Sequence, residues 1–229
     1  MSLIKLEKVT KVYGEGDIAV RALRGVDLTI ERGAFVAVAG PSGSGKSTML
    51  NIMSGLDRPT SGTCILDGHE INSMSGAALS AFRRENVGFI FQAYNLLPVL
   101  TALENTEYVM MLQGVPTKER EERARAMLAR VGLEGMGDRF PHQLSGGQQQ
   151  RVAVARAIVS EPSLVLADEP TANLDSETGY ALMDLMGELN DEKGATFVFS
   201  THDPKVMERS KEIIRLHDGT IAGRESTGA

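Results

Sequence analysis

Residues 40–48 constrain what this chain can fold into more than any other part of the sequence. They fit the G-x-x-x-x-G-K-[ST] pattern of loops that cradle phosphate groups, and read Gly40-Pro41-Ser42-Gly43-Ser44-Gly45-Lys46-Ser47-Thr48. Residues 35–39 predict a strand buried on both faces, and residues 48–54 predict a helix. Glycines let the loop turn its backbone N–H groups inward, and the helix N-terminus adds a partial positive charge. The stretch therefore predicts a nucleoside triphosphate site, with Lys46 at the β- and γ-phosphates and Ser47 at Mg²⁺.

The composition narrows the class of protein around this loop. The chain has 229 residues, 42% of them hydrophobic, enough for one large domain with a substantial core. Its formal net charge is −6, so nothing favours general binding to nucleic acid. The single cysteine, Cys64, lies in an apolar run and is expected to be a small core residue in a reducing compartment. No apolar run approaches the roughly 20 residues that span a bilayer, so membrane association is expected only through a partner.

A second phosphate-binding pattern is the run Leu144-Ser145-Gly146-Gly147-Gln148. Ser145 and Gln148 satisfy the S-x-x-Q capping box, which predicts a helix over residues 145–159. The capping box does not explain Gly146 and Gly147, because glycine inside a helix costs up to about 1 kcal/mol relative to alanine. Glycines at this place would let a phosphate approach the helix N-terminus, so we predict a second anion site here.

Polar side chains follow two further apolar runs. Asp168 and Glu169 come directly after residues 164–167, and His202 follows the run at residues 196–200. Ligands of open α/β sheets bind outside the carboxyl ends of the strands. Asp168 is therefore placed to hold Mg²⁺, Glu169 to polarise an attacking water, and His202 to contact a γ-phosphate. The plainer interpretations are an acidic turn and a structural histidine.

The remaining pattern predicts a β-rich N-terminal part and a helical insertion. Polar and apolar residues alternate over residues 3–9 and 20–30, which together with residues 62–66 predict an antiparallel sheet. Helices are expected over residues 102–113 and 118–131, where apolar positions recur with helical spacing. The polar tail from Arg224 to Ala229 is expected to be frayed.

Several side chains have more than one interpretation. Tyr13 either caps the N-terminal sheet with its ring or forms a platform on which adenine stacks. Met110 and Met111 are either core residues or part of an adaptable contact surface. Arg151 and Arg156 are expected to face solvent or to form ion pairs between parts of the domain, rather than to act in catalysis.

The order of these motifs resembles the ATPase subunit of ATP-binding-cassette (ABC) transporters. The correspondence comprises the Walker A at residues 40–48, the Q-loop glutamine Gln92, the signature at 144–148, the Walker B at 164–169, the D-loop at 172–175 and the switch histidine His202. Residues 91–98 and 144–159 look most like the lipoprotein-releasing and macrolide-exporting branch. Residues 109–111 depart from that branch, which often carries a proline there, so the exact membrane partner stays open.

The resemblance implies a fold and an assembly. The fold is an α/β P-loop NTPase (RecA-like) core with an N-terminal antiparallel β subdomain and an inserted α-helical subdomain at about residues 93–143, all within one ATPase domain over residues 1–229. The assembly is a head-to-tail dimer of two copies, with each ATP between one Walker A and the other copy's signature. Residues 92–139 would drive an integral membrane permease, which exports lipoprotein, peptide or drug, from the cytoplasmic face of the membrane.

The resemblance also assigns roles to single residues. Tyr13 would stack on adenine, and Ser145, Gly146, Gly147 and Gln148 would contact the partner's ATP. Ser47, Gln92 and Asp168 would surround Mg²⁺. Glu169 would activate water and His202 would hold the γ-phosphate.

Three other functions deserve comparison. A non-transport member of the same branch would signal through a membrane partner to cell-wall enzymes, and the sequence leaves this open. A chromosome-maintenance or DNA-repair ATPase would need long coiled-coil heptads between residues 92 and 144, which are absent. A GTPase should carry an N-K-x-D motif, which is also absent, and neither it nor a small-molecule kinase explains residues 144–148.

Overall fold

The computed structural model describes residues 1–227, apart from the side chain of Asp17, and shows an α/β fold built on two sheets. The smaller sheet has the strand order β2-β1-β4-β5, with antiparallel pairing throughout. Its strands are β1 (Ser2–Tyr13), β2 (Val20–Glu31), β4 (Ser61–Leu66) and β5 (His69–Glu70). The predicted N-terminal antiparallel sheet is therefore confirmed.

The larger sheet has the order β10-β9-β3-β8-β7-β6 and is parallel from β9 to β6. Its strands are β3 (Phe35–Ala39), β6 (Val87–Ile90), β7 (Leu164–Ala167), β8 (Thr196–Thr201), β9 (Glu212–His217) and β10 (Thr220–Ser226). Every residue of β3, β7 and β8 is buried, as expected for strands covered on both faces.

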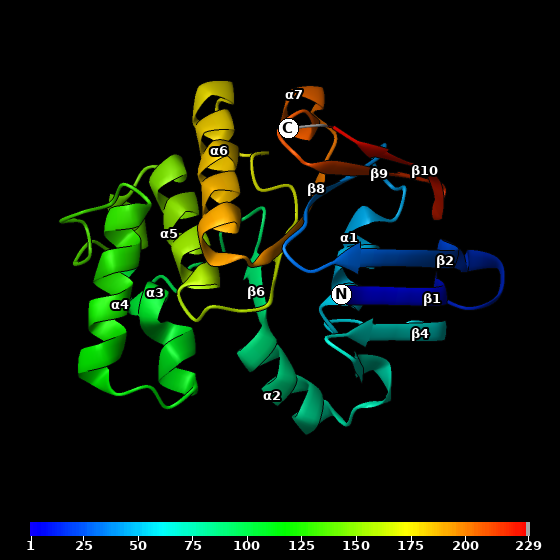
Figure 1. The fold of residues 1–229 in the computed structure, drawn as a ribbon, viewed down its shortest axis with the longest axis horizontal. Helices are drawn as coiled ribbons and strands as arrows, with labels where there is room; N and C mark the ends of the chain where they lie inside the picture. The colour runs from blue at the N-terminus through cyan, green and yellow to red at the C-terminus, as the bar shows by residue number, and fades with distance from the viewer. Residues whose placement is uncertain (228–229) are drawn as a thin grey trace.

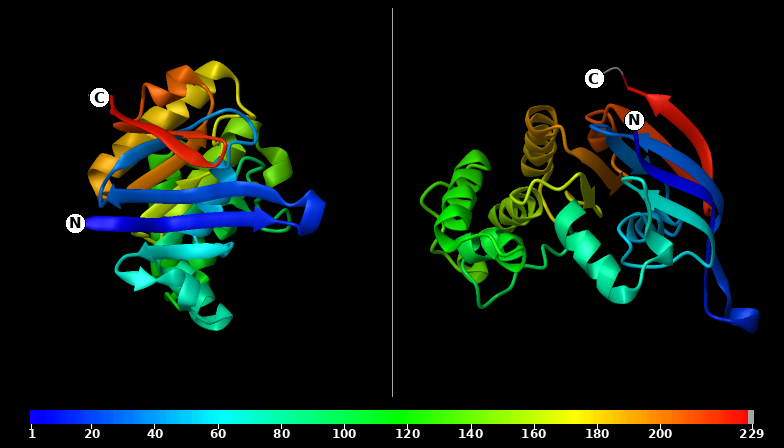
Figure 2. Two further views of the ribbon diagram at one scale, coloured as in Figure 1. Left: turned by 90° about the vertical axis from the view of Figure 1, so that its right-hand side faces the viewer. Right: turned by 60° about the horizontal axis from the view of Figure 1, so that its bottom comes forward.

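Helices cover this sheet and extend the molecule at one end. They are α1 (Lys46–Met53), α2 (Gly76–Asn86), α3 (Ala102–Leu112), α4 (Thr117–Arg130), α5 (Gly146–Ile158), α6 (Ser176–Lys193) and α7 (Pro204–Met207). Figure 1 shows α3, α4 and α5 together at one end, with β1, β2 and β4 at the other. Figure 2 shows β1, β2 and β4 side by side and the helical part projecting away from them.

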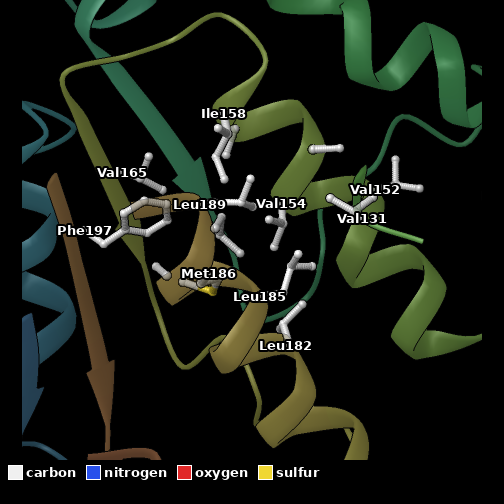
Figure 3. Close-up of a cluster of buried hydrophobic side chains, with 14 of the residues drawn as sticks. Val131, Val152, Val154, Ile158, Val165, Leu182, Leu185, Met186, Leu189 and Phe197 are labelled. Atoms are coloured by element: carbon white, nitrogen blue, oxygen red, sulfur yellow. The ribbon is translucent and has the colours of Figure 1, made fainter. Parts of the chain in front are cut away.

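The core has two parts, one on each face of the larger sheet. One packs α5 and α6 onto β7 and β8, as Figure 3 shows for Val154, Ile158, Met186, Leu189 and Phe197. The other packs α1 between the two sheets. Met110 belongs to the first part, which confirms the core interpretation for it, whereas its neighbour Met111 is 44% exposed and lies outside the core.

Two expectations about single residues have clear outcomes. Cys64 is fully buried in the second part of the core, as predicted, and burial raises the pKa of its thiol to about 12. The expectation of a frayed tail is wrong for residues 224–226, because β10 runs to Ser226 and Arg224 pairs with Glu212 on β9. Residues 228–229 lie outside the described part of the chain.

Gly88 shows how closely the helical layer approaches the edge of the larger sheet. A Cβ atom at this position would lie 2.1 Å from the carbonyl oxygen of Ala157 on α5. We predict that Gly88→Ala lowers the free energy of unfolding by about 1–3 kcal/mol, because a helix backbone cannot easily move aside. Chemical denaturation measures this loss.

The matched control is Gly187→Ala in the middle of α6, where a new Cβ meets no atom within 4 Å. That change should stabilise the protein by about 0.5–1 kcal/mol, because alanine is the better helix former. Equal effects of the two substitutions would contradict the packing described for β6 and α5.

Candidate nucleotide site

The motifs at residues 40–48, 168–169 and 202 meet at one edge of the larger sheet. They follow β3, β7 and β8, which are neighbours in the sheet and run parallel. An open pocket of about 600 Å³ lies at this edge. It is lined by residues of the phosphate loop, by Gln92, Glu169, Ala172 and His202, and by Val20, Arg21 and Ala22 from β2.

The phosphate loop is held in a shape that requires glycine. Gly43 and Gly45 have φ values of 78° and 104°, in the region that side chains disfavour. A Cβ atom on Gly45 would lie 2.5 Å from the carbonyl oxygen of Ala22. Lys46 is 8% exposed, and its Nζ donates to the carbonyl oxygens of Gly40 at 2.8 Å and Pro41 at 3.1 Å. The lysine charge is therefore directed at the mouth of the loop by the loop itself.

Asp168 receives two hydroxyl groups on one carboxylate oxygen. Ser47 Oγ donates to Asp168 Oδ1 at 3.0 Å, and Ser200 Oγ donates to the same atom at 2.6 Å. A hydroxyl and a carboxylate this close offer the hard oxygen ligands that Mg²⁺ prefers. Residues 1–227 contain no cluster of three or more His, Cys, Asp or Glu side chains arranged for a metal.

Glu169 points into the pocket from a left-handed backbone conformation, with a φ value of 46°. Both of its carboxylate oxygens lie 3.1 Å from His202 Nδ1, and Oε1 lies 3.9 Å from Lys46 Nζ. The Glu169 side chain is 18% exposed and that of His202 is 70% exposed. A carboxylate so placed can accept a proton from a water molecule beside a bound phosphate.

Gln92 lies on the pocket wall, and the chain after it is fixed by contacts from the helical layer. Asn173 donates to the Gln92 carbonyl oxygen at 2.8 Å. Arg156 donates to the carbonyl oxygens of Tyr94 at 2.8 Å and Asn95 at 2.6 Å, two residues with positive φ. The expectation that Arg156 faces solvent or forms an ion pair is therefore wrong, and burial lowers the pKa of its guanidinium.

Arg151, on the same helix, follows a similar pattern. Its guanidinium donates to the carbonyl oxygen of Val131, just after α4, at 2.8 Å. Both arginines of α5 thus hold backbone segments that come before the helix in the sequence. Sequence patterns gave no indication of this, because backbone carbonyls carry no sequence signature.

Tyr13 lies outside the set of residues that line the pocket, at the outer end of the β1–β2 hairpin. Its hydroxyl donates to Asp57 Oδ2 at 2.7 Å, and Lys11 Nζ lies 4.8 Å from the centre of its ring. Burial and the bond to Asp57 raise the pKa of Tyr13. Tyr13 is 41% exposed and pairs with Val20 on β2, which lines the pocket, so the stacking role stays a prediction.

The signature residues form a separate surface. Ser145 and Gln148 make both bonds of the predicted capping box, at 3.3 and 2.9 Å. The premise that the two glycines meet no local need is wrong. A Cβ on Gly146 would lie 2.9 Å from Tyr94 Oη, and one on Gly147 would lie 2.7 Å from Thr178 Cγ2.

A hollow of about 410 Å³ adjoins this helix start, and Asn173 and Asp175 contribute to its wall. None of the residues that line it also lines the nucleotide pocket. Within one described chain, the signature and the phosphate loop therefore belong to different sites. The D-loop connects them, because Ala172 lines one site and Asn173 the other.

Comparisons with known proteins agree with this geometry. Residues 23–172 match the family described as ABC transporter. An uncharacterised ABC transporter ATP-binding protein of Thermotoga maritima is 48% identical, with 99% of this chain and 96% of the relative covered. The macrolide export ATP-binding/permease protein MacB of Hyphomonas neptunium is 50% identical over 96% of this chain, which spans 34% of MacB.

The dimeric structure of the cassette MJ0796 in a post-hydrolysis state bound to ADP and Pi has a TM-score of 0.91 to this chain. It is 45% identical in sequence, and the match covers 98% of this chain and 99% of that one. MJ0796 comes from Methanocaldococcus jannaschii.

The fold and the pocket thus define a P-loop ATPase that binds and hydrolyses ATP. More specifically, the chain belongs to the ABC transporter family as an ATP-binding subunit, and its relatives agree with the macrolide-exporter-like branch. Within residues 1–227, no helix has both the length and the apolar character needed to cross a membrane.

The position of Glu169 generates a prediction about chemistry. Glu169→Gln should keep ATP binding and lose on the order of 10²–10⁴ in turnover, because an amide cannot accept a proton from water. Phosphate release and nucleotide binding are measured on the same sample. Glu177→Gln, an exposed glutamate at the start of α6, serves as the control and should hydrolyse ATP normally. Near-normal turnover in Glu169→Gln would remove this residue from the role of base.

The position of Tyr13 generates a prediction about the nucleotide base. Tyr13→Ala should weaken the binding of ATP and GTP alike by about 1–3 kcal/mol, because stacking uses the ring face and not its substituents. Tyr13→Phe keeps the ring and loses only the bond to Asp57, so its binding should stay within a few-fold of the unmodified chain. Inorganic triphosphate, which has no base, should bind equally to all three proteins. A loss of triphosphate binding in Tyr13→Ala would show that the residue supports the fold instead.

Proposed function

We propose that this chain works as a head-to-tail dimer in which each ATP lies between the phosphate loop of one copy and the signature of the other. One observation carries the proposal. The signature residues 145–148 line a hollow of their own, with no residue in common with the nucleotide pocket of the same chain. A second copy can bring its signature to the nucleotide pocket of the first. If a two-fold axis relates the two head-to-tail copies, both pockets receive a signature and the assembly is closed. The dimeric structures of MJ0796 support this assembly.

The pocket residues then take defined roles. Ser47, Gln92 and Asp168 hold Mg²⁺, which neutralises phosphate charge when it is bound. Glu169 orients water and accepts its proton, while His202 contacts the γ-phosphate and fixes the Glu169 carboxylate through its Nδ1 atom. Lys46 neutralises charge on the phosphates. Tyr13 stacks on adenine beside the pocket, next to its β2 partner Val20, which lines the pocket wall.

We further propose that the helical subdomain at about residues 93–143 contacts a separate membrane permease. The side chains of four apolar residues at its surface are between 38% and 78% exposed: Leu97, Val99, Met111 and Leu112. A groove of about 200 Å³ has Phe89, Phe91 and Val109 in its wall, and Val109 precedes Met111 by two residues on α3. Exposed apolar residues are typical of protein interfaces where they form a contiguous patch, and Met111 and Leu112 are neighbours in the chain.

The relatives support this reading of the surface. MacB and the pyoverdine export protein PvdT of Pseudomonas fluorescens are described as ATP-binding/permease proteins, and this chain spans 34% of each. The chain would then lie at the cytoplasmic face of the membrane. We propose that the permease exports a lipoprotein, peptide or drug, and the descriptions of MacB as a macrolide exporter and of PvdT as a pyoverdine exporter support a role in export.

The dimer is tested best with signature variants whose steric effect is controlled. Every variant also carries Glu169→Gln, which should keep the bound ATP from being hydrolysed. Each carries Thr178→Ser as well, which removes the methyl group that would lie 2.7 Å from a new Cβ at position 147. Gly147→Ala should still dimerise with Mg-ATP in sedimentation. In Gly147→Asp the ATP-dependent association constant of the dimer should fall at least about a hundredfold. The new carboxylate would lie beside the γ-phosphate held by the other copy, and like charges 4 Å apart repel by roughly 4 kcal/mol at an effective dielectric of 20.

Binding of ATP to the separate monomer should be unchanged in both variants. If Gly147→Asp loses monomer binding, the signature acts on the nucleotide of its own chain. If it dimerises as well as Gly147→Ala, residues 145–148 form a capping box without a role in the assembly. Either result contradicts the proposed dimer.

A further inference from the structure

Ser200, at the end of β8, is a buried polar residue that no motif accounts for. Its side chain is fully buried, and it is the second residue before His202. Its Oγ atom donates to Asp168 Oδ1 at 2.6 Å and accepts the backbone N–H of Glu169 at 2.8 Å. One hydroxyl therefore contacts both acidic residues of the site.

The two bonds act on different features of these acidic residues. The bond to Asp168 fixes which carboxylate oxygen faces Ser47, since Oδ1 accepts from both hydroxyls. The bond from Glu169 holds the backbone just where φ is 46°, a conformation that costs energy for a residue other than glycine. Glu169 reaches His202 Nδ1 from this conformation.

Packing alone does not explain a hydroxyl at this place. The other residues in the middle of β8 are Phe197, Val198 and Phe199, all fully buried and apolar. A buried hydroxyl is tolerated only if it is hydrogen-bonded, and both partners of Ser200 are acidic residues of the site, Asp168 and Glu169. The bonds of Ser200 therefore serve the site more directly than they serve the core.

We propose that Ser200 is a positioning residue that sets the Asp168 carboxylate for Mg²⁺ and the Glu169 backbone for the attacking water. The proposal rests on the proposed Mg²⁺ site. Partners of this kind, one shell away from a metal, typically change metal affinity by about 10–100-fold when they are removed. Removal of the Ser200 hydroxyl should therefore raise the Mg²⁺ concentration needed for nucleotide binding, in addition to any loss of stability.

The test is a Mg²⁺ titration of nucleotide binding. A fluorescent, non-hydrolysable ATP analogue is bound to the full chain at increasing Mg²⁺ concentration. In Ser200→Ala the Mg²⁺ midpoint should rise at least about tenfold, while binding of the analogue without Mg²⁺ should be unchanged. Ser200→Cys keeps nearly the same volume but donates weakly, so it should show a rise in the same direction. It also provides the test if the alanine variant does not fold.

Thr196→Val is the matched control on the same strand. Thr196 is fully buried at the opposite end of β8, and its hydroxyl accepts a backbone N–H, that of Gly33, at 2.8 Å. Its loss should lower thermal stability about as much as Ser200→Ala does, and should leave the Mg²⁺ midpoint unchanged. The comparison separates a positioning role from the general cost of an unpaired buried group.

Two results would overturn the inference. If the unmodified chain responds to Mg²⁺ and Ser200→Ala responds at the same concentration, Ser200 is a structural residue and the proposed function stands. If the unmodified chain binds the analogue without any response to Mg²⁺, the proposed metal site itself is wrong and the role of Ser200 fails with it.

Discussion

The parallel pairing of β3, β8 and β7 is the constraint on which the site depends. Ala39 pairs with Thr201 and Ala167 pairs with Phe199, so the three strands end at one edge of the sheet. Each strand is buried along its whole length, and Gly40, Asp168 and His202 follow at or just beyond the strand ends. Phosphate-binding backbone, carboxylates and histidine therefore meet without any long loop having to bring them together.

A second constraint is the connection between this edge and the helical layer. Asn173 donates to the carbonyl oxygen of Gln92, and Arg156 on α5 donates to the carbonyl oxygens of Tyr94 and Asn95. A displacement of α5 must therefore move the segment after Gln92, and the reverse also holds. In the proposed transport cycle, this connection would carry the movement of the nucleotide site to the surface around Met111.

The sequence predicted those features that depend on local pattern. The phosphate loop, the acidic pair after β7 and the capping box at Ser145 each occupy a few consecutive residues with a fixed chemical requirement, and the strands and helices around them were confirmed. Ser200 and Arg156 escaped prediction because their partners lie 31 to 62 residues away and include backbone atoms. The methyl group of Thr178 likewise leaves too little space for a side chain at Gly147, and this contact between distant parts of the sequence is visible only in the folded structure.

Mixing two inactive variants tests the shared site most directly. One copy carries Lys46→Ala in the phosphate loop, and the other carries Gly147→Asp in the signature together with Thr178→Ser. In a mixed dimer, one site combines an intact phosphate loop with an intact signature from the other copy. If the two copies share each site, the mixture should hydrolyse ATP, which neither variant does alone. A mixture that hydrolyses no faster than the mean of the two variants would contradict it.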